Sequence, residues 1–591
     1  MIPFRRSWGA DPIGEHRWEF RIWAPGCERM GLLLDGREHA MDKDAEGWFH
    51  TELPADPGTD YRFAPPGGPH VPDPAARAQA ADVHGASVLV DPGAFDWQTR
   101  WAGRPWHEVV LYELHTGAFS PEGTFDGVAR RLDHLADLGI TAIELCPVAQ
   151  FAGTRGWGYD GVLLYAPHVA YGGPEGLKRL IDAAHARGLM VFLDVVYNHF
   201  GPDGNYLHAY APEFFHAERH TPWGAAIAYD LAPVRRFFVE NALYWLDEYR
   251  FDGLRLDAVD QIDDPSDEPI LAEIARAVRE HGFDRPVHLT TEDDRNITRF
   301  HERNEDGSPK LYDGEWNDDW HHVTHVLATA ESEGYFRDYA DDPRGDMATA
   351  LATGFVQQGR PSPFRDGAPR GEQSAHLPPP AFVNFLQNHD QTGNRAFGER
   401  LTTLAEPRAV EVLTALLLLS PHTPLLFMGE EWGETRPFQY FTDFHGDLAD
   451  AVREGRRREF ARWAQFADPG LREKIPDPND RATFERSRLD WNALDADPGR
   501  ARYELIQRLV DIRELEIAHR LAGMSGHSGE TETPGERGVS ARWRLGDGGQ
   551  LRILANLGGA PFEAAIPGLE LFSLGDVARD PWAIHATLEA P

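Results

Sequence analysis

The sequence predicts an α/β protein built on a (β/α)8 TIM barrel, with a β-sandwich on its N-terminal side and an antiparallel β-domain on its C-terminal side. From about residue 106, apolar strand-like runs alternate with amphipathic helical ones, as in parallel α/β folds. Eight such runs occur, and no dinucleotide-type glycine fingerprint follows the first, which favours a closed barrel over an open sheet. Acidic segments recur at the ends of several runs, which indicates one shared site.

The β-sandwich is expected over residues 1–95. Short alternating segments occur there, separated by Gly, Pro and Asp turn signals: WEFRIWAP, MGLLLDG, GWFHTEL and DYRFAP. The turn-rich stretch 65–78 is expected to be a loop within this domain, which resembles a carbohydrate-binding domain.

The barrel is expected over residues 96–490. Its strand candidates are VVLYELHTG (109–117), AIELCPV (142–148), MVFLDVVYNH (190–199), FDGLRLDAV (251–259), VHLTTED (287–293), KLYDGEWN (310–317), AFVNFLQNHD (381–390) and PLLFMGEE (424–431). Amphipathic helical patterns follow the first four, at 125–139, 174–188, 234–249 and 268–282. Long connections at 200–232 and 335–380 interrupt this rhythm, and either could line or cover a cleft.

Residues 491–591 are expected to hold an amphipathic helix at 503–520 and the C-terminal β-domain, after a linker at 469–481. The segments VSARWRLG, QLRILANLG, FEAAIPG and LELFSLGD supply its strands.

The composition excludes several classes of partner. The chain of 591 residues is long enough for two or three domains, and its formal net charge of −37 is spread along the whole length. This charge disfavours nucleic acid and anionic membrane surfaces. No run approaches the roughly 20 apolar residues of a membrane span, and the N-terminus has no apolar stretch long enough for a signal peptide, so a cytoplasmic location is expected.

Neither a disulfide framework nor a zinc cluster can be built from the cysteines, Cys27 and Cys146. Cys146 sits in an apolar run and is expected to be a buried, reduced thiol. No cofactor and no metal are expected, because the acidic residues form no dense loop with the spacing of calcium ligands.

Three acids at strand ends are the candidate catalytic residues: Asp257, Glu292 and Asp390. Breaking a glycosidic bond through an oxocarbenium-like transition state needs a protonated acid at the leaving oxygen and an ionised carboxylate at the anomeric carbon. Arg255 points to the same side of its strand as Asp257 and would keep that acid ionised. Glu292 could donate the proton, since the neighbouring acids at 293 and 294 would raise its pKa. Asp390 could bind the sugar hydroxyls.

Each of these residues also has a structural interpretation. A single Asp at a strand end is more often a helix cap or turn former, and a lone His is more often a satisfied core or surface residue. The three acids together, with His199 and His389 at equivalent places, favour function. Aromatic residues at strand ends belong to the core about as often as they bind sugar rings; the candidates of this kind are Trp157, Tyr159, Trp316 and Trp432. Asp194 is expected to support Arg255 and the sugar pocket.

The segments DVVYNH, GLRLDAVD, TEDDRN and FLQNHDQTGN resemble, in order, the four signature regions of the α-amylase superfamily of retaining glycoside hydrolases. The resemblance implies that Asp257 is the nucleophile, Glu292 the general acid/base and Asp390 the transition-state stabiliser. It also implies that Arg255, His199, His389 and Tyr159 bind the sugar ring on the glycone side of the cleaved bond.

Within that superfamily, the segments YELHTGAFSPEGTFDG, RGWGYDGVLLYAPHVAYGGPEGLK, TEDDRN and YDGEWNDDWHH are similar to the maltooligosyltrehalose trehalohydrolase family. That resemblance implies a maltooligosyl trehalose substrate, release of trehalose, and functional coupling with a maltooligosyltrehalose-forming enzyme. Glycogen branching enzymes, which are transferases, are the near alternative, because they share the sandwich, the barrel and the YELH segment. A remoter alternative is a sugar-binding barrel without catalysis.

One departure from the superfamily pattern concerns the leaving side of the cleaved bond. Many α-amylases carry a Lys-His pair just after the nucleophile segment, where this chain has Asp260 and Gln261. These side chains could hydrogen-bond the hydroxyls of a trehalose leaving group, so we expect them to contribute to substrate specificity.

Overall fold

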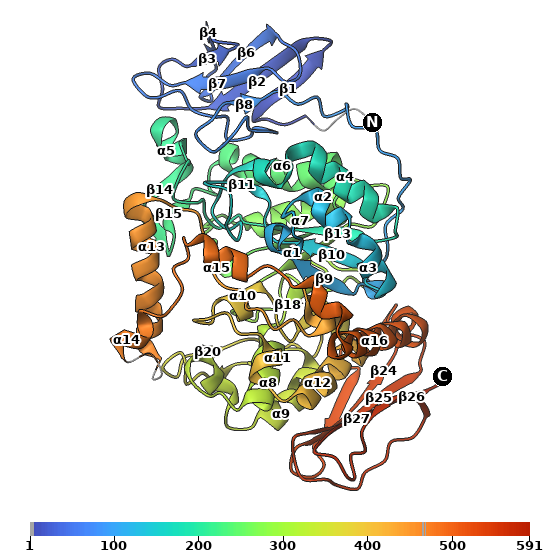
Figure 1. Cartoon of the computed structure of the whole chain (residues 1–591). Coiled ribbons are helices and arrows are strands. Elements are labelled where there is room, and N and C mark those ends of the chain that lie inside the picture. The colour runs from blue at the N-terminus through green and yellow to red at the C-terminus, as the bar shows by residue number, and fades with distance from the viewer. Residues whose placement is uncertain (1–4, 464–465, 467) are drawn as a thin grey trace.

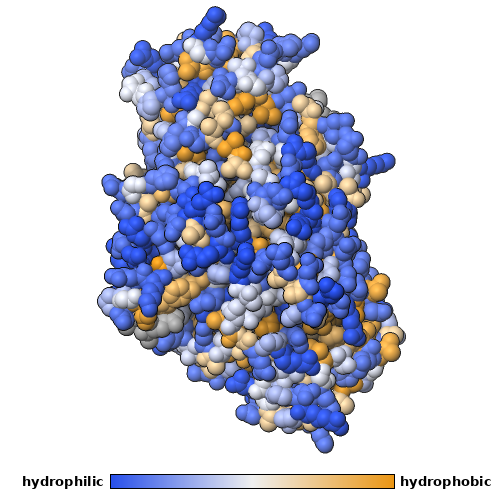
Figure 2. All heavy atoms as spheres, viewed as in Figure 1, coloured by the Kyte–Doolittle hydropathy of each residue, from blue (hydrophilic) through white to orange (hydrophobic). Residues whose placement is uncertain are grey.

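The computed structural model describes residues 5–463, 466 and 468–591. The barrel occupies the middle of the molecule, with the N-terminal sheets above it and the C-terminal sheet below and to one side (Figure 1). The face drawn in Figure 2 is mainly hydrophilic, with smaller hydrophobic areas, some of them over the N-terminal sheets. No helix in the described ranges is long and apolar enough to cross a membrane.

In the described part of the chain, eight parallel strands close into a barrel. They are β9 (Leu111–Leu114), β10 (Ala142–Leu145), β13 (Met190–Val195), β16 (Gly253–Leu256), β17 (His288–Thr291), β18 (Gly314–Trp316), β21 (Phe382–Phe385) and β22 (Thr423–Phe427). Each strand coincides with one of the predicted runs, so the predicted TIM barrel is confirmed.

The interior of the barrel changes from apolar to charged along the strands. Leu111, Ala142 and Phe192 belong to the apolar cluster inside the barrel. Because side chains alternate along a strand, the residues two positions later point in the same direction. Those residues are charged: Glu113 on β9, Glu144 on β10 and Asp194 on β13, together with Arg255 on β16. The charged side chains therefore gather where the strands end, at the usual catalytic face of this fold.

Helices follow the strands largely as the periodicity predicts. They are α4 (Gly173–His185), α6 (Ala232–Glu248) and α7 (Ile270–Glu280). The pattern predicted at 125–139 is split into α2 (Phe125–Ala129) and α3 (Leu132–Asp137). The break lies at Arg131, whose backbone is outside the helical region and whose guanidinium lies 4.2 Å from the ring of Trp491.

Both long connections carry structure of their own. The first holds α5 (Leu207–Tyr210) and the hairpin of β14 (Phe215–Thr221) and β15 (Gly224–Ile227). The second follows α8 (Asp318–Thr329) and holds the 3-10 helix η5 (Gly334–Tyr339), α9 (Pro343–Thr353) and the pair of β19 (Arg360–Pro361) and β20 (Pro369–Arg370). After β22, the helix α13 (Gly446–Glu459) runs along one side of the barrel (Figure 1).

The N-terminal strands form antiparallel sheets with the orders β1-β2-β6-β5 and β4-β3-β7-β8. Their bounds are β1 (Gly9–Gly14), β2 (Arg17–Trp23), β3 (Gly31–Leu34), β4 (Arg37–Ala40), β5 (Asp42–Lys43), β6 (Trp48–Pro54), β7 (Asp60–Ala64) and β8 (Ser87–Val88). Alternate residues of β2 are buried, namely Trp18, Phe20 and Ile22, as expected when one face of a sheet covers a core.

The C-terminal strands form one antiparallel sheet with the order β23-β24-β25-β27-β26. Their bounds are β23 (Gly529–Glu532), β24 (Gly538–Arg544), β25 (Gln550–Leu557), β26 (Leu569–Leu574) and β27 (Trp582–Glu589). The helix before them, α16 (Asp497–Ile512), begins earlier than predicted and continues as irregular helical turns to residue 520. The predicted linker contains the short helix α14 (Pro469–Arg472).

Candidate active site

Arg255 lies at the centre of the predicted site and is fully buried. Its Nη1 donates hydrogen bonds to Asp194 Oδ2 at 2.6 Å and to Asp257 Oδ1 at 2.9 Å. Its Nη2 forms an ion pair with Glu292 Oε2 at 2.6 Å. The guanidinium lies 4.3 Å from the centre of the Trp316 ring, which supports its flat face. One rigid cation thus fixes the two carboxylates, Asp257 and Glu292, relative to each other.

Asp257 follows β16 and is 7% exposed. Besides Arg255, it accepts a 2.8 Å hydrogen bond from Asn198 Nδ2 on its Oδ2, and the same amide donates to its backbone carbonyl. Donors thus reach each of its carboxylate oxygens, an arrangement that suits an anionic nucleophile.

Glu292 follows β17 and differs from Asp257 in its electrostatics. Burial raises its pKa well above the usual value, and the negative charges of Asp257, Asp390 and Asp318 add to this effect, whereas Arg255 opposes it. The Ala258 N–H donates to its Oε2 at 2.9 Å. The raised pKa shifts Glu292 toward the protonated form that a general acid needs.

The predicted direction of the Glu292 pKa shift is confirmed, but the predicted cause is wrong. Asp293 forms an ion pair with Arg295 at 2.6 Å, and Asp294 forms one with Arg365 at 2.5 Å. These neighbours in sequence are each paired with an arginine, and the pKa of Glu292 is raised instead by burial and by acids from other strands.

His389 and Asp390 begin the helix α10 (His389–Gly393), which follows β21 after a short turn at 386–388. His389 Nδ1 lies 2.5 Å from Glu113 Oε1, and the His389 backbone N–H donates to Glu113 Oε2 at 2.9 Å. Burial lowers the pKa of His389, but the charges of Asp390 and Glu113 outweigh it and raise the pKa to about 10. His389 Nε2 lies 3.4 Å from Asp390 and has no hydrogen-bond partner in the described ranges, so it can donate to a ligand.

Tyr159 and Trp157 surround the His389 imidazole. The Tyr159 hydroxyl donates to Asp194 Oδ2 at 2.6 Å, and its ring stacks on His389 with centroids 5.0 Å apart. Trp157 meets His389 edge to face at 5.3 Å and packs on Phe438, with its indole N–H bound to the Gln439 carbonyl. Trp157 is buried, so it supports His389 from behind.

His199 follows β13, and its Nδ1 contacts Asn198 Oδ1. Its ring stacks on Trp223, with centroids 4.5 Å apart and planes 11° from parallel. Trp223 lies in the turn between β14 and β15 and is 50% exposed, so the first long connection presents an aromatic ring beside the site.

Three further predicted residues have different surroundings. Asp260 and Gln261 lie in the 3-10 turn after Asp257 and hydrogen-bond each other; burial and the charge of Asp294 raise the pKa of Asp260 to about 6. Trp432 packs on Trp491, away from the Arg255 cluster.

The rings of Trp316 and Trp432 are each 3% exposed, so neither presents a face to a sugar. These two residues are withdrawn from the predicted sugar-binding set. Trp316 supports Arg255, and Trp432 belongs to the core between the barrel and the helices that follow it.

A cavity of about 220 Å³ borders the cluster beside Asp390. Asp294 and Asp318 line it, and the second long connection contributes Phe364 and Arg365 to its wall. Asp318 and Asp390 also line this cavity, and the charges of both raise the pKa of Glu292.

Several residues of the site escaped sequence reasoning. Glu113 is a charged residue inside the otherwise apolar strand LYEL, and that mismatch was a usable signal. Asn198 lies within the segment DVVYNH, but no contact with the catalytic acids was predicted for it. Trp223 gave no signal, because its position depends on the geometry of the hairpin.

A grouping of possible metal ligands lies under the site, formed by Glu113, Cys146 and His389. Glu113 and His389 hydrogen-bond each other, and burial raises the pKa of the Cys146 thiol well above its usual value. The amide nitrogen of Asn198 contacts Asp257, and its amide oxygen contacts His199.

We expect Glu113→Gln to lower the stability of the protein by about 3 kcal/mol at neutral pH, since it breaks a buried ion pair. The pKa of His389 is raised above its unfolded value, so its contribution to stability is fully present below pH ~6.5 and is lost as the pH rises through about 10. The difference in unfolding free energy between wild type and variant should therefore shrink from pH 6.5 to pH 10 in denaturant titrations. A constant difference would contradict a protonated His389.

Comparisons with known proteins agree with the barrel fold. The family described as "Alpha amylase, catalytic domain" matches residues 99–223, and a domain of unknown function, DUF3459, matches residues 526–590. A crystal structure of a candidate alpha amylase from Salmonella typhimurium is 49% identical, with a TM-score of 0.94, and covers 99% of this chain and 100% of that one. A pullulanase from Anoxybacillus, 17% identical with a TM-score of 0.71, shares the fold; the match covers 99% of this chain and 87% of that one.

Among curated relatives, the malto-oligosyltrehalose trehalohydrolase of Deinococcus radiodurans is 41% identical over 89% of this chain and 86% of its own length. That of Mycobacterium tuberculosis is 38% identical over 93% and 94%. A 1,4-alpha-glucan branching enzyme from Rhizobium meliloti is 32% identical but covers only 42% of this chain and 39% of its own. The chain is a glycoside hydrolase of the α-amylase superfamily and belongs to the malto-oligosyltrehalose trehalohydrolase family.

Proposed function

We propose that this protein cleaves the α-1,4-glucosidic bond next to the terminal trehalose of maltooligosyl trehalose, with retention of configuration, and releases trehalose and a maltooligosaccharide. The observation that supports this proposal is that one cation, Arg255, contacts two carboxylates whose surroundings differ. Asp257 receives hydrogen bonds from Arg255 and Asn198, whereas Glu292 has a raised pKa although it contacts the same guanidinium. A retaining glycosidase needs one ionised and one protonated acid side by side.

In the first step, Glu292 gives its proton to the glycosidic oxygen as Asp257 Oδ attacks the anomeric carbon. The carbon–oxygen bond to trehalose breaks, and a covalent bond forms between the sugar and Asp257. Glu292 is then ionised, and its contact with Arg255 Nη2 stabilises the new charge.

In the second step, water attacks the anomeric carbon of the glycosyl enzyme. Glu292 takes the proton from that water, and the bond between the sugar and Asp257 breaks. Two inversions at the same carbon give net retention, and both acids return to their starting states.

On the glycone side, we place the sugar ring among Tyr159, His199, His389 and Asp390. His389 offers an Nε2–H donor without a partner in the described residues, and Asp390 accepts from ring hydroxyls. Both groups can bind more tightly as the ring flattens toward the oxocarbenium ion, which favours the transition state over the bound substrate.

On the leaving side, we place trehalose in the 220 Å³ cavity beside Asp390. Phe364 is 49% exposed and lines this cavity, and an exposed ring offers an apolar face to a sugar. Arg365, which is paired with Asp294, supplies donors to hydroxyl groups at the same wall.

We expect the double substitution Asp260→Lys with Gln261→His to lower the preference for trehalosyl over maltosyl ends by about tenfold. Removing polar groups built to pair with trehalose hydroxyls costs about 1–3 kcal/mol of discrimination. The ratio of kcat/KM for maltotriosyl trehalose to kcat/KM for maltopentaose checks this. An unchanged ratio would exclude these residues from specificity.

Product analysis tests the proposed function itself. The purified protein, without added metal, is incubated separately with maltotriosyl trehalose, maltopentaose and amylose, and the products are identified by chromatography. Free trehalose with maltotriose, and little attack on the other substrates, supports the proposal. New α-1,6 branches on amylose without trehalose would assign a branching transferase, and no product from any substrate would assign a sugar-binding barrel.

The same proposal implies a reaction partner in metabolism. A maltooligosyltrehalose-forming enzyme must supply the substrate, and the two activities would together convert maltooligosaccharides into trehalose. A cytoplasmic location remains part of this proposal.

A further inference from the structure

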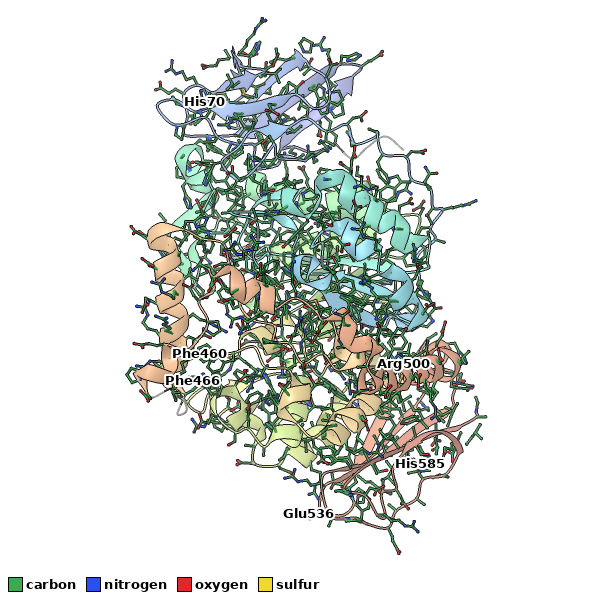
Figure 3. The ribbon with its side chains drawn as sticks, in the orientation of Figure 1. His70, Phe460, Phe466, Arg500, Glu536 and His585 are labelled. Atoms are coloured by element: carbon green, nitrogen blue, oxygen red, sulfur yellow. The ribbon has the colours of Figure 1, made fainter. Side chains whose placement is uncertain are left out.

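Glu144 is a buried acid inside the barrel that takes no part in the two steps of the proposed reaction. It lies on β10 and is 1% exposed, and neither of its carboxyl oxygens has a hydrogen-bond partner in the described residues. Figure 3 shows how densely side chains fill the barrel, to which β10 belongs. An unpaired buried carboxyl group destabilises a fold, and in native proteins such a group has a bound water, an ion or a functional role.

Glu144 lies between two other acids of the barrel interior. In the pairing of β9 with β10 it stands opposite Glu113, and paired strands are about 5 Å apart. On the other side, Asp194 lies two residues beyond Phe192, the partner of Glu144 on β13. Burial raises the pKa of Glu144 well above its usual value, and the charges of Asp194 and Glu113 add to this effect. Glu144 is thereby shifted toward the neutral form, whose O–H can donate a hydrogen bond.

Unpaired polar atoms from three further strands face the same interior. Asp194, Arg255 and Thr290 are successive partners in the register of β13, β16 and β17. Each has one buried atom without a hydrogen-bond partner in the described ranges, namely Asp194 Oδ1, Arg255 Nε and Thr290 Oγ1. Partners on neighbouring strands point to the same side of a sheet, so these atoms gather beneath Asp257 and Glu292, which follow β16 and β17.

Bridging water would satisfy this group of atoms. A buried water molecule typically makes about three hydrogen bonds to polar groups that otherwise lack a partner. Donors and acceptors are both present: the protonated Glu144 carboxyl, the Thr290 hydroxyl and the Arg255 Nε–H can donate, and Asp194 Oδ1 can accept.

Asp194 connects this buried layer to the catalytic acids. Its Oδ2 accepts from Arg255 Nη1 and from the Tyr159 hydroxyl, each at 2.6 Å. Arg255 Nη1 also donates to the nucleophile, Asp257, at 2.9 Å. Because Oδ2 is already occupied on both of these contacts, the orientation of the Asp194 carboxylate depends on what reaches Oδ1.

We propose that Glu144 is a positioning residue for the reaction: its carboxyl group donates through buried water to Asp194 Oδ1 and thereby holds the Arg255 guanidinium between Asp257 and Glu292. This inference rests on the proposed function. Glu144 touches neither the substrate nor the reacting acids, and it acts through Asp194 and Arg255. Its burial costs stability, whereas the alignment that it maintains favours the transition state.

The test begins with Glu144→Leu, which removes the hydrogen-bonding group and keeps an apolar side chain in its place. We expect kcat for maltotriosyl trehalose to fall about 30-fold with KM within about threefold, because the reacting groups lose their alignment while the sugar contacts remain. The melting temperature should equal or exceed that of wild type, since an unpaired buried polar group is removed. Glu144→Gln keeps an amide donor and should restore kcat to within about threefold of wild type.

Glu240→Leu is the matched control. Glu240 is also a buried glutamate, but its two oxygens accept hydrogen bonds from the backbone N–H and the hydroxyl of Ser7, at 2.7 and 2.6 Å. These contacts join α6 to the segment before β1. Glu240→Leu should therefore lower the melting temperature and leave kcat unchanged, which is the opposite pattern to that of Glu144→Leu.

The pH profile separates positioning from a general loss of packing. Burial raises the pKa of Asp194 to about 6, and losing a donor to its ionised form should raise this pKa further. Since Asp194 must be ionised to hold Arg255, the acidic limb of kcat/KM should move up by about one pH unit in Glu144→Leu and stay in place in Glu144→Gln. The titratable and charged groups that act on Asp194 or are acted on by it are Arg255, Asp257, His389, Tyr159, Cys146 and Glu144.

Hydrolysis of α-maltosyl fluoride separates this inference from the proposed function, because it uses Asp257 and Arg255 without a trehalose leaving group. We expect Glu144→Leu to lower kcat for this substrate about 30-fold as well. Wild-type kcat in Glu144→Leu, or a loss of kcat that accompanies a lower melting temperature and is not restored in Glu144→Gln, would overturn the inference. A slower Glu144→Leu variant on α-maltosyl fluoride, together with a wild type that releases no trehalose from maltotriosyl trehalose, would overturn only the proposed function.

Discussion

Asp257→Asn is expected to reduce kcat for maltotriosyl trehalose by about 10⁴-fold or more, with little change in KM. The amide keeps the size of the side chain and can still accept a hydrogen bond from Arg255 Nη1, but it cannot form a glycosyl ester. Initial-rate kinetics measure the loss. Mass spectrometry of wild type quenched during turnover should show a covalent glycosyl adduct on Asp257, which the variant lacks.

The matched control is Asp306→Asn, in an exposed loop between β17 and β18, which should keep wild-type kinetics. Activity of the Asp257→Asn variant within tenfold of wild type would exclude Asp257 as the nucleophile.

A smaller residue should allow chemical rescue. In Asp257→Gly, azide can enter the vacated space beside Arg255 and attack the anomeric carbon of α-maltosyl fluoride, displacing fluoride. The product should be β-maltosyl azide, because a single displacement inverts the carbon. An α-azide, or no rescue at any azide concentration, would argue against attack from the Asp257 side.

The barrel could be predicted from the sequence because its signal is local. Each strand is a short apolar run followed by an amphipathic helix, and alternation along a strand places Arg255 and Asp257 on one side without reference to the rest of the chain. The acids at the ends of β16, β17 and β21 follow from the same rule, since parallel strands end on one face of a barrel.

The features of the site that could not be predicted from the sequence depend on contacts between distant segments. The pKa of Glu292 is raised by burial and by acids from other strands, not by Asp293 and Asp294, because those neighbours find partners in Arg295 and Arg365. Arg365 lies 71 residues from Asp294, so no local pattern reveals that pair.

The aromatic residues show the same limit. Trp316 and Trp223 both occur near strand ends or in long connections, yet the first is buried under Arg255 and the second is exposed beside His199. Which ring faces a ligand is decided by the packing of the hairpin β14–β15 and of the barrel interior, and this is visible only in three dimensions.

The loss of activity caused by Glu292→Gln is expected to depend on the leaving group of the substrate. With maltotriosyl trehalose, kcat should fall by about 10³-fold, because the poor leaving group needs the proton that Gln cannot give. With α-maltosyl fluoride, whose fluoride leaves without protonation, the first step should be nearly unaffected. The second step lacks its base, so the glycosyl enzyme should accumulate and appear as a burst of fluoride release.

The pH dependence gives an independent check of the same role. Burial and the charges of Asp257, Asp390 and Asp318 raise the pKa of Glu292, so the wild type keeps the proton to a higher pH than an ordinary glutamate does and should lose activity as the pH rises through that pKa. In Glu292→Gln, the burst phase with α-maltosyl fluoride should lack this alkaline loss, while Glu305→Gln, in an exposed loop, should retain the wild-type profile. Equal losses on both substrates would mean that Glu292 fixes Arg255 and Asp257 in place without transferring a proton, and the assignment of the acid would then have to move to another strand end.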